Sequence, residues 1–259
     1  MGHERIGFLP KTKQWQSIVH ELVKYSGDSE VISKIAENTL YCIRSSYNSI
    51  AYDESMISAI RFLTTLCFSA SSDSQGEYLN QQGFCTDSEL SLFSLMKSVE
   101  QYLATSTASL EINKMAKDAL MQALVTYKQS HETVQLKLAG FESDSVWSKT
   151  ATGAAFCELT RSFVASFTDR QLRYYLERVA AGTLSNYSQL VSFTKELTAQ
   201  TNAITSHTSE VSKIMQSFAA GWYNKYSART TPPDSDISRF LSMAFGKIKE
   251  EFRREAAGL

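Results

Sequence analysis

The sequence predicts an all-α protein: an irregular multi-helix bundle of about eight helices, one of them a coiled-coil-like helix of about 40 residues. Three observations predict this fold class. No proline occurs between Pro10 and Pro232, and proline is the residue that helix interiors tolerate least. Apolar residues recur at spacings of three and four along most of the chain. Polar segments with glycine or capping residues separate these stretches.

The first three predicted helices lie before residue 71. The first runs over 12–26, with Thr12 as its N-cap and Gly27 at its C-terminal end. The second begins near Asp28, and the third covers about 53–70. Their expected apolar faces consist of Trp15, Ile18, Val19, Leu22 and Val23 in the first helix, Ile32, Ile35, Leu40, Ile43 and Tyr47 in the second, and Met56, Ile60, Leu63 and Cys67 in the third.

A polar segment over 71–85 predicts a loop. Thr86 and Glu89 then form a capping-box pattern, which predicts the start of a fourth helix. The fifth helix is expected from about Ser109 to Gly140, because the helical spacing of apolar residues continues that far. A strand over 133–138, "TVQLKL", is the alternative that this spacing disfavours.

The segment 140–152 interrupts the helical pattern and predicts a junction. It would divide an N-terminal helical lobe, 12–139, from a C-terminal helical lobe, 153–259, and one continuous domain is the alternative. The sixth helix is expected from about Ala154, with a break where Thr168 and Gln171 repeat the capping pattern. The last helix follows the stop signal "TTPPDSD" and carries a regular apolar stripe from Ile237 onward.

The seventh helix is expected over 185–227 and is the longest. Leu190, Leu197, Ile204, Val211 and Phe218 repeat every seven residues, as in a coiled-coil seam. Polar residues interrupt this seam at Gln200 and His207, and His131 takes a similar place in the fifth helix. The two histidines either form a pH-sensitive or metal-linked contact between these helices, or they are polar inlays that fix helix register. The inlay is favoured.

The composition excludes several classes of protein. Of the 259 residues, 43% are hydrophobic and 20% are charged, and the formal net charge is −1. So small a charge predicts no strong field toward nucleic acid or a membrane surface. We expect no signal peptide and no membrane span, since no uncharged stretch approaches the roughly 20 apolar residues required. Four widely spaced cysteines indicate free thiols, as is typical of a cytoplasmic protein.

No motif indicates a catalytic, metal or cofactor site. Glycine-rich phosphate loops, G-x-S-x-G and histidine pairs at zinc spacing do not occur. We therefore expect no cofactor and no bound metal. A Cys–His dyad of Cys157 with His131 or His207 is the arrangement that an enzyme with a dispersed site would use, and it is disfavoured.

A basic and aromatic stripe is expected on the sixth helix. Nine residues contain four such side chains, Arg170, Arg173, Tyr174 and Arg178, at spacings that place them on one side of a helix. Arginine and tyrosine bind phosphates and stack on bases, and both are also enriched at protein interfaces. Asp169 and Glu177 interrupt the stripe, which favours an ordinary solvated face. A protein contact is the next interpretation and a nucleic-acid contact the third.

The N-terminal arm, residues 1–11, differs from the rest of the chain. Its apolar residues Ile6, Phe8 and Leu9 are unusual for a free tail, because disordered segments are poor in such residues. The arm either folds back over the bundle as a strap, which is favoured, or docks onto a partner.

The stretches "RIGFLPKTKQW", "IVHEL" and "FTDRQLRYYLERV" resemble uncharacterised helical subunits encoded in multigene bacterial phage-defence clusters. The resemblance covers a small part of the chain and brings no functional residue with it. It implies a subunit that acts with partners in antiviral defence.

These observations predict a non-enzymatic helical subunit of a larger cytoplasmic assembly. Its partner would be another protein or a second copy of the chain, bound through the N-terminal arm and the long-helix seam. A nucleic-acid-binding component that uses residues 170–178 is the alternative, and an enzyme with an unrecognised site is the second alternative.

Overall fold

The structure, a computed structural model, describes residues 12–23, 29–43, 47–86, 90–104, 109–132, 144–184, 186–211, 213–226 and 231–256. Every regular element in these ranges is helical, which confirms the predicted all-α fold class. The elements are α1 (Lys13–Val23), α2 (Ser29–Ile43), α3 (Tyr47–Ile50), α4 (Glu54–Ser69), α5 (Gln75–Gln81), α6 (Leu92–Ala104), α7 (Leu110–His131), α9 (Asp144–Trp147), the 3-10 helix η1 (Ser148–Thr150), α10 (Gly153–Thr183), α11 (Tyr187–Val211), α12 (Lys213–Lys225) and α13 (Asp234–Ala256).

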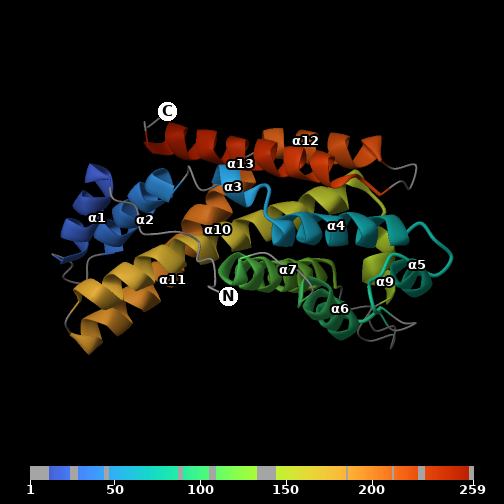
Figure 1. Ribbon diagram of the computed structural model, residues 1–259, viewed down its shortest axis with the longest axis horizontal. Coiled ribbons are helices and arrows are strands. Elements are labelled where there is room, and N and C mark those ends of the chain that lie inside the picture. Colours follow the sequence, from blue (N-terminus) through green and yellow to red (C-terminus); the bar gives the residue numbers. More distant parts are fainter. Residues whose placement is uncertain are drawn as a thin grey trace.

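The helices form an elongated bundle (Figure 1). The blue helices α1 and α2 gather with α11 at one end, and α5, α6 and α9 lie at the other end. α10 passes between the two groups and contacts α1, α2, α4, α7, α11 and α12. It is therefore the element around which the other helices pack.

α10 has 31 residues and is the longest described helix. Thr152 caps its start, because the Thr152 Oγ1 accepts a hydrogen bond of 3.1 Å from the Ala155 N–H. The predicted break at Thr168 and Gln171 is wrong, since α10 is continuous there and buries both side chains. A cap is needed only where the first N–H groups of a helix lack partners, and here the preceding turns supply carbonyl groups.

Two hydrophobic cores lie along α10. The larger core joins the first half of α10 with α4, α6, α7, α12 and α13. The smaller core joins the second half of α10 with α1, α2 and the start of α11. Each core takes residues from both sides of the segment 140–152, and Trp147 within that segment is fully buried in the larger core. Tyr174 packs against both cores.

Several predicted helix starts and faces are confirmed. The Trp15 N–H donates to Thr12 Oγ1 at 3.2 Å, so Thr12 caps α1 as expected. The face of α1 is narrower than predicted, because Val23 is exposed. Asp53 caps α4 by accepting from the Ser55 N–H at 2.8 Å, and the expected apolar residues of α4 are all buried. Gly27 lies outside the described residues.

The segment 71–85 is not a plain loop, since α5 lies within it. Thr86 does not cap the next helix either, because its hydroxyl donates to the Gly76 carbonyl oxygen at 3.2 Å. The reciprocal cap of α6 lies later, where Ser91 and Ser94 each donate a backbone N–H to the other's hydroxyl at 3.0 Å. The predicted start of this helix is therefore wrong, because Thr86 is held in the turn after α5.

Two further helix ends differ from the prediction. α7 ends at His131, where Glu132 takes an extended backbone, and the expected continuation to Gly140 lies outside the described residues. The helix predicted over 185–227 is described as α11 and α12, on either side of residue 212. The structure therefore does not show one helix of about 40 residues.

A polar contact joins the end of α12 to the start of α13. The Tyr226 hydroxyl donates to the Asp236 carboxylate, and Lys225 Nζ lies 3.5 Å from the same carboxylate oxygen. The hydrogen bond from Tyr226 is the largest cause that lowers the pKa of Asp236 below its usual value. Asp236 also lies in the first turn of α13, where the helix dipole favours a negative charge.

Two glycines of α10 provide a matched test of the packing between α10 and α12. A Cβ at Gly153 would lie 3.1 Å from Ala220 Cβ and 3.2 Å from Ala220 Cα, whereas nothing lies within 4 Å of a Cβ at Gly182. We expect Gly153→Ala to lower the free energy of unfolding by about 1 kcal/mol. Gly182→Ala should raise it by about 0.5–1 kcal/mol. Urea unfolding measures both, and a stabilising Gly153→Ala would contradict the close approach of the helices.

Tyr226→Phe should raise the pKa of Asp236 toward its ordinary value, because the phenol stabilises the charged carboxylate. A carboxyl group whose pKa is lowered by folding stabilises the protein above its unfolded pKa. That stabilisation is lost as the pH falls through the folded pKa. The variant should therefore lose less stability on acidification than the wild type does. Carboxyl NMR titration and urea unfolding at neutral and acidic pH measure the two effects, and exposed Tyr52→Phe should change neither.

Candidate interaction surface between α7 and α10

A groove of about 560 Å³ lies on the surface between the start of α7 and the second half of α10. Each helix contributes four residues at positions i, i+3, i+4 and i+7, so one face of each helix lines the groove. The lining residues are Glu111, Lys114, Met115 and Asp118 from α7, and Arg170, Arg173, Tyr174 and Glu177 from α10.

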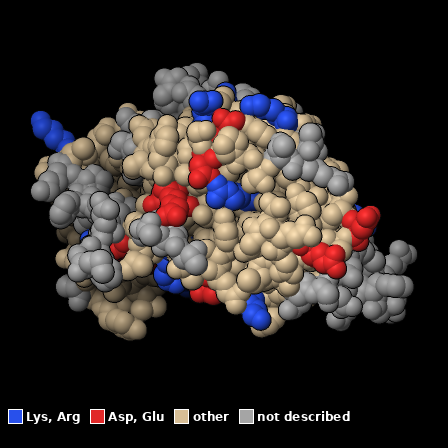
Figure 2. All heavy atoms as spheres, turned by 45° about the vertical axis from the view of Figure 1, so that its right-hand side comes forward, with Lys and Arg blue, Asp and Glu red and all other residues tan. Residues whose placement is uncertain are grey.

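The charges in this groove are mixed. Three of its side chains are acidic and three are basic, so their formal charges cancel. Lys114 Nζ lies 3.3 Å from Asp118 Oδ2 on the same helix, and Arg173 Nη2 lies 2.7 Å from Oδ2 of the buried Asp169. Figure 2 shows the same intermixing on one face of the molecule, where isolated basic and acidic side chains stand among uncharged residues.

Two charged groups of the groove are partly buried. Burial lowers the pKa of Arg170, and nearby Asp118 opposes this change. Burial also raises the pKa of Glu177, which Arg173 partly offsets. Arg170 directs Nη1 at its own helix, where it donates to the Ser166 carbonyl oxygen at 3.2 Å. Partial burial thus disfavours the charged form of both groups.

The structure brings together three of the four residues of the predicted basic and aromatic stripe. Arg170, Arg173 and Tyr174 line the groove. Arg178 lies beside it, where its Nη1 donates to the Tyr174 hydroxyl at 3.1 Å and its guanidinium carbon stands 5.1 Å from the Tyr174 ring centroid. Sequence reasoning missed the α7 side of the groove, because the only signal there is a short run of charges at helical spacing.

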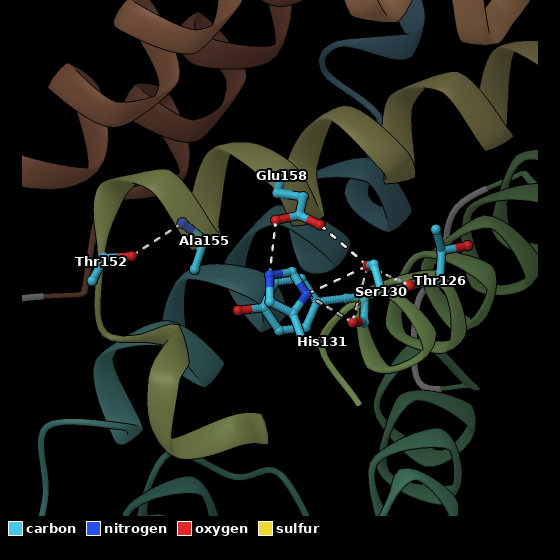
Figure 3. A network of polar contacts seen from close by, with 7 residues as sticks. Thr126, Ser130, His131, Thr152, Ala155 and Glu158 are labelled. Carbon is cyan, nitrogen blue, oxygen red and sulfur yellow. Dashed lines mark hydrogen bonds and ion pairs between the residues drawn. The ribbon is translucent and has the colours of Figure 1, made fainter. Parts of the chain in front are cut away.

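A second group of polar contacts joins the end of α7 to the first half of α10 (Figure 3). His131 Nε2 lies 3.4 Å from Glu158 Oε2, and the Ser130 hydroxyl lies 3.4 Å from Glu158 Oε1. The His131 ring also stacks on Tyr127, with ring centroids 4.2 Å apart. His131 lies in the last turn of α7, where the helix dipole favours a positive charge.

The serine, histidine and glutamate do not have the geometry of a hydrolytic triad. His131 Nδ1 lies 3.0 Å from the Tyr127 carbonyl oxygen, which can only accept, so this nitrogen carries a hydrogen. The nitrogen that lies 3.4 Å from the Ser130 hydroxyl is this same Nδ1, and it therefore does not accept the serine proton as a triad requires. The Ser130 hydroxyl instead donates to the Thr126 carbonyl oxygen at 2.8 Å. The arrangement acts as a clasp between two helices.

Most of the other predicted site residues are not described by the structure. Ile6, Phe8 and Leu9 of the arm lie outside the described residues, and so do the side chains of Gln200 and His207. Phe193 and Leu197, early in the predicted seam, are buried in the smaller core. Burial raises the pKa of the Cys157 thiol, which therefore stays protonated near neutral pH and is a weak nucleophile.

Replacing His131 or Glu158 by glutamine should destabilise the protein only slightly. Their side chains are 36% and 35% exposed, and exposed ion pairs contribute about 0.2–1 kcal/mol. A double-mutant cycle followed by urea unfolding should give a coupling energy in that range. The exposed Lys114–Asp118 pair of α7 is the comparison, and its coupling energy should be of similar size. A coupling energy of zero between His131 and Glu158 would show that their contact does not stabilise the fold.

Within the described ranges, no group of three or more histidine, cysteine, aspartate or glutamate residues is placed to hold a metal ion. A search of the same residues finds no helix whose length and hydropathy would let it cross a membrane. Comparison of the chain with models of protein families, with curated proteins and with solved structures finds no match.

Proposed function

We propose that the protein is a non-enzymatic binding subunit and that it engages another protein chain at the groove between α7 and α10. The observation that carries this proposal is the groove itself, where charges of both signs surround the half-buried Tyr174. Arginine and tyrosine are enriched at protein interfaces. A partner with matching charges would pair with these side chains.

The chemistry of the lining favours a protein over a small molecule. Sites for small molecules are mostly apolar with a few polar groups, whereas six of the eight residues here are charged. Leu110, next to Glu111 at the start of α7, adds an exposed apolar side chain that is 58% accessible. Arginine and tyrosine are enriched at protein interfaces, and the lysine, glutamates and aspartate of the groove suit the polar rim of such an interface.

The same groove does not suit nucleic acid. Phosphate binding requires an excess of cations, and here three carboxylates share the surface with three cations. The buried Asp169 also offsets the charge of Arg173, which lowers the attraction for a phosphate further. A phosphate near Arg170 would also lie close to Asp118 and be repelled by it.

Phe193 and Leu197 of the long-helix seam are covered by the chain itself. Docking along the rest of that seam stays a prediction, since the side chains of residues 200–215 lie outside the described part. Docking by the N-terminal arm stays a prediction, since residues 1–11 lie outside the described part. A role in antiviral defence within a larger cytoplasmic assembly also stays a prediction, supported by the sequence resemblance alone.

A photo-crosslinking experiment in the cells that make the protein tests the proposal. Benzoylphenylalanine replaces Lys114 in the groove or, as a matched control, the exposed Lys195 on α11. We expect a discrete protein adduct from position 114 and none from position 195. No protein adduct at 114, equal adducts at both positions, or an adduct at 114 that nuclease removes would each overturn the proposal.

A further inference from the structure

The charges of the groove are ordered along its length, because α7 and α10 run antiparallel. His131, at the end of α7, meets Glu158 near the start of α10. Asp118, earlier in α7, lies close enough to Arg170, later in α10, for its charge to raise the pKa of Arg170. Continued along both helices, this register brings Glu111 and Glu177 to the same end of the groove. We call this end of the groove, which carries these two acidic side chains, the acidic end.

Next to the acidic end lies a basic zone, formed by Lys114 and Arg173. The two zones are separated by about one helical turn, or roughly 5 Å along the axis. The half-buried Tyr174 lies at the level of the basic zone and supplies apolar surface between the charged side chains, whereas Met115 beneath it belongs to the larger core. The surface thus has an acidic part and a basic part side by side.

The hydrogen-bonding capacity of these zones is only partly used. Lys114 has three donors, of which Asp118 takes one, and its side chain is 77% exposed. Arg173 gives one of its five donors to Asp169 and buries its Nε–H, so the donors left for a partner are on its Nη atoms. Among the described residues, Glu111 and Glu177 have no cation within ion-pair distance, and Glu111 accepts only from the Ser109 hydroxyl at 3.2 Å. Both zones therefore have capacity for an additional partner.

We infer that the occupant of this groove is a second copy of the chain. In a two-fold interface the same patch meets itself in inverted order, so a residue at one position faces a residue at another. The acidic end of one copy then lies over the basic zone of the other, and the reverse contact forms by symmetry. This inference rests on the proposed function and names the partner of the same surface.

The charge balance is the argument for self-association over a different partner. Because acids and bases are equal in number, two copies of the patch do not repel each other as a whole, and the inverted order places opposite charges together. A strongly acidic or strongly basic partner would meet like charge over half of the groove. Exposed Leu110, beside Glu111, would lose its contact with water in the paired arrangement.

A charge-swap experiment on the full chain tests the inference. One variant carries Glu111→Lys and Glu177→Lys, and the other carries Lys114→Glu. Arg173 is left in place, because its pair with buried Asp169 belongs to the fold. Sedimentation equilibrium should show the wild type associating to a species of twice the 29.0 kDa chain mass. Each variant alone should bind itself at least about tenfold more weakly.

An equimolar mixture of the two variants should restore association, since each acidic side chain then meets a basic one across the interface. Lys195→Glu, the matched control on α11, should leave the association constant unchanged. Circular dichroism confirms that every variant is folded. A wild type that stays monomeric, variants that associate like the wild type, or a mixture that does not recover would each overturn the inference.

The photo-crosslink at position 114 separates this inference from the proposed function. If that position captures a different protein and the chain is monomeric, the second-copy inference fails while the binding function stands. If position 114 captures no protein and the chain is monomeric, both fail. If position 114 captures this same chain, both are supported.

Discussion

The burial of α10 over much of its circumference is the constraint on which the rest of the structure depends. A helix that hides about half of its 31 residues cannot stand at the surface, so helices must cover it on several sides. α4, α7 and α12 cover its first half, and α1, α2 and α11 cover its second half. The buried Asp169 carboxylate of α10 pairs with Arg173 four residues later, which offsets the cost of burying its charge.

The groove is a product of the same packing. Where apolar residues dominate, α7 and α10 interlock through side chains such as Leu120, Leu124 and Phe163 in the larger core. Toward the start of α7 the facing residues become long and charged, and such side chains keep their charged ends toward solvent instead of interlocking. The two helices therefore hold between them a surface that is neither a closed core nor freely hydrated.

The sequence predicted what depends on local chemistry. The absence of proline and the helical period identified the all-α class, and Thr12 was identified as a cap because it bonds within its own turn. The caps predicted at Thr86 and Thr168 were wrong. Thr86 bonds across a turn to Gly76, and Thr168 is buried in the middle of α10. Whether a capping pattern acts as a cap is decided by the groups around it, which a sequence pattern does not contain.

The candidate site was predicted only in part, for the same reason. The arginines and the tyrosine of α10 were identified because they lie on one helix at regular spacing. Glu111 and Asp118 join them only through the antiparallel pairing of two helices distant in sequence, and no local signal carries that pairing. The same pairing places acidic residues of α7 beside the stripe, so the surface as a whole carries equal numbers of acidic and basic side chains and no excess of positive charge.

Tyr174 has a consequence for communication through the molecule. Its ring packs against both hydrophobic cores while its side chain also lines the groove. A molecule that contacts this ring therefore touches a side chain that both cores share. If its binding changes how Tyr174 packs against one core, its affinity and the stability of that core are linked, and the link is reciprocal.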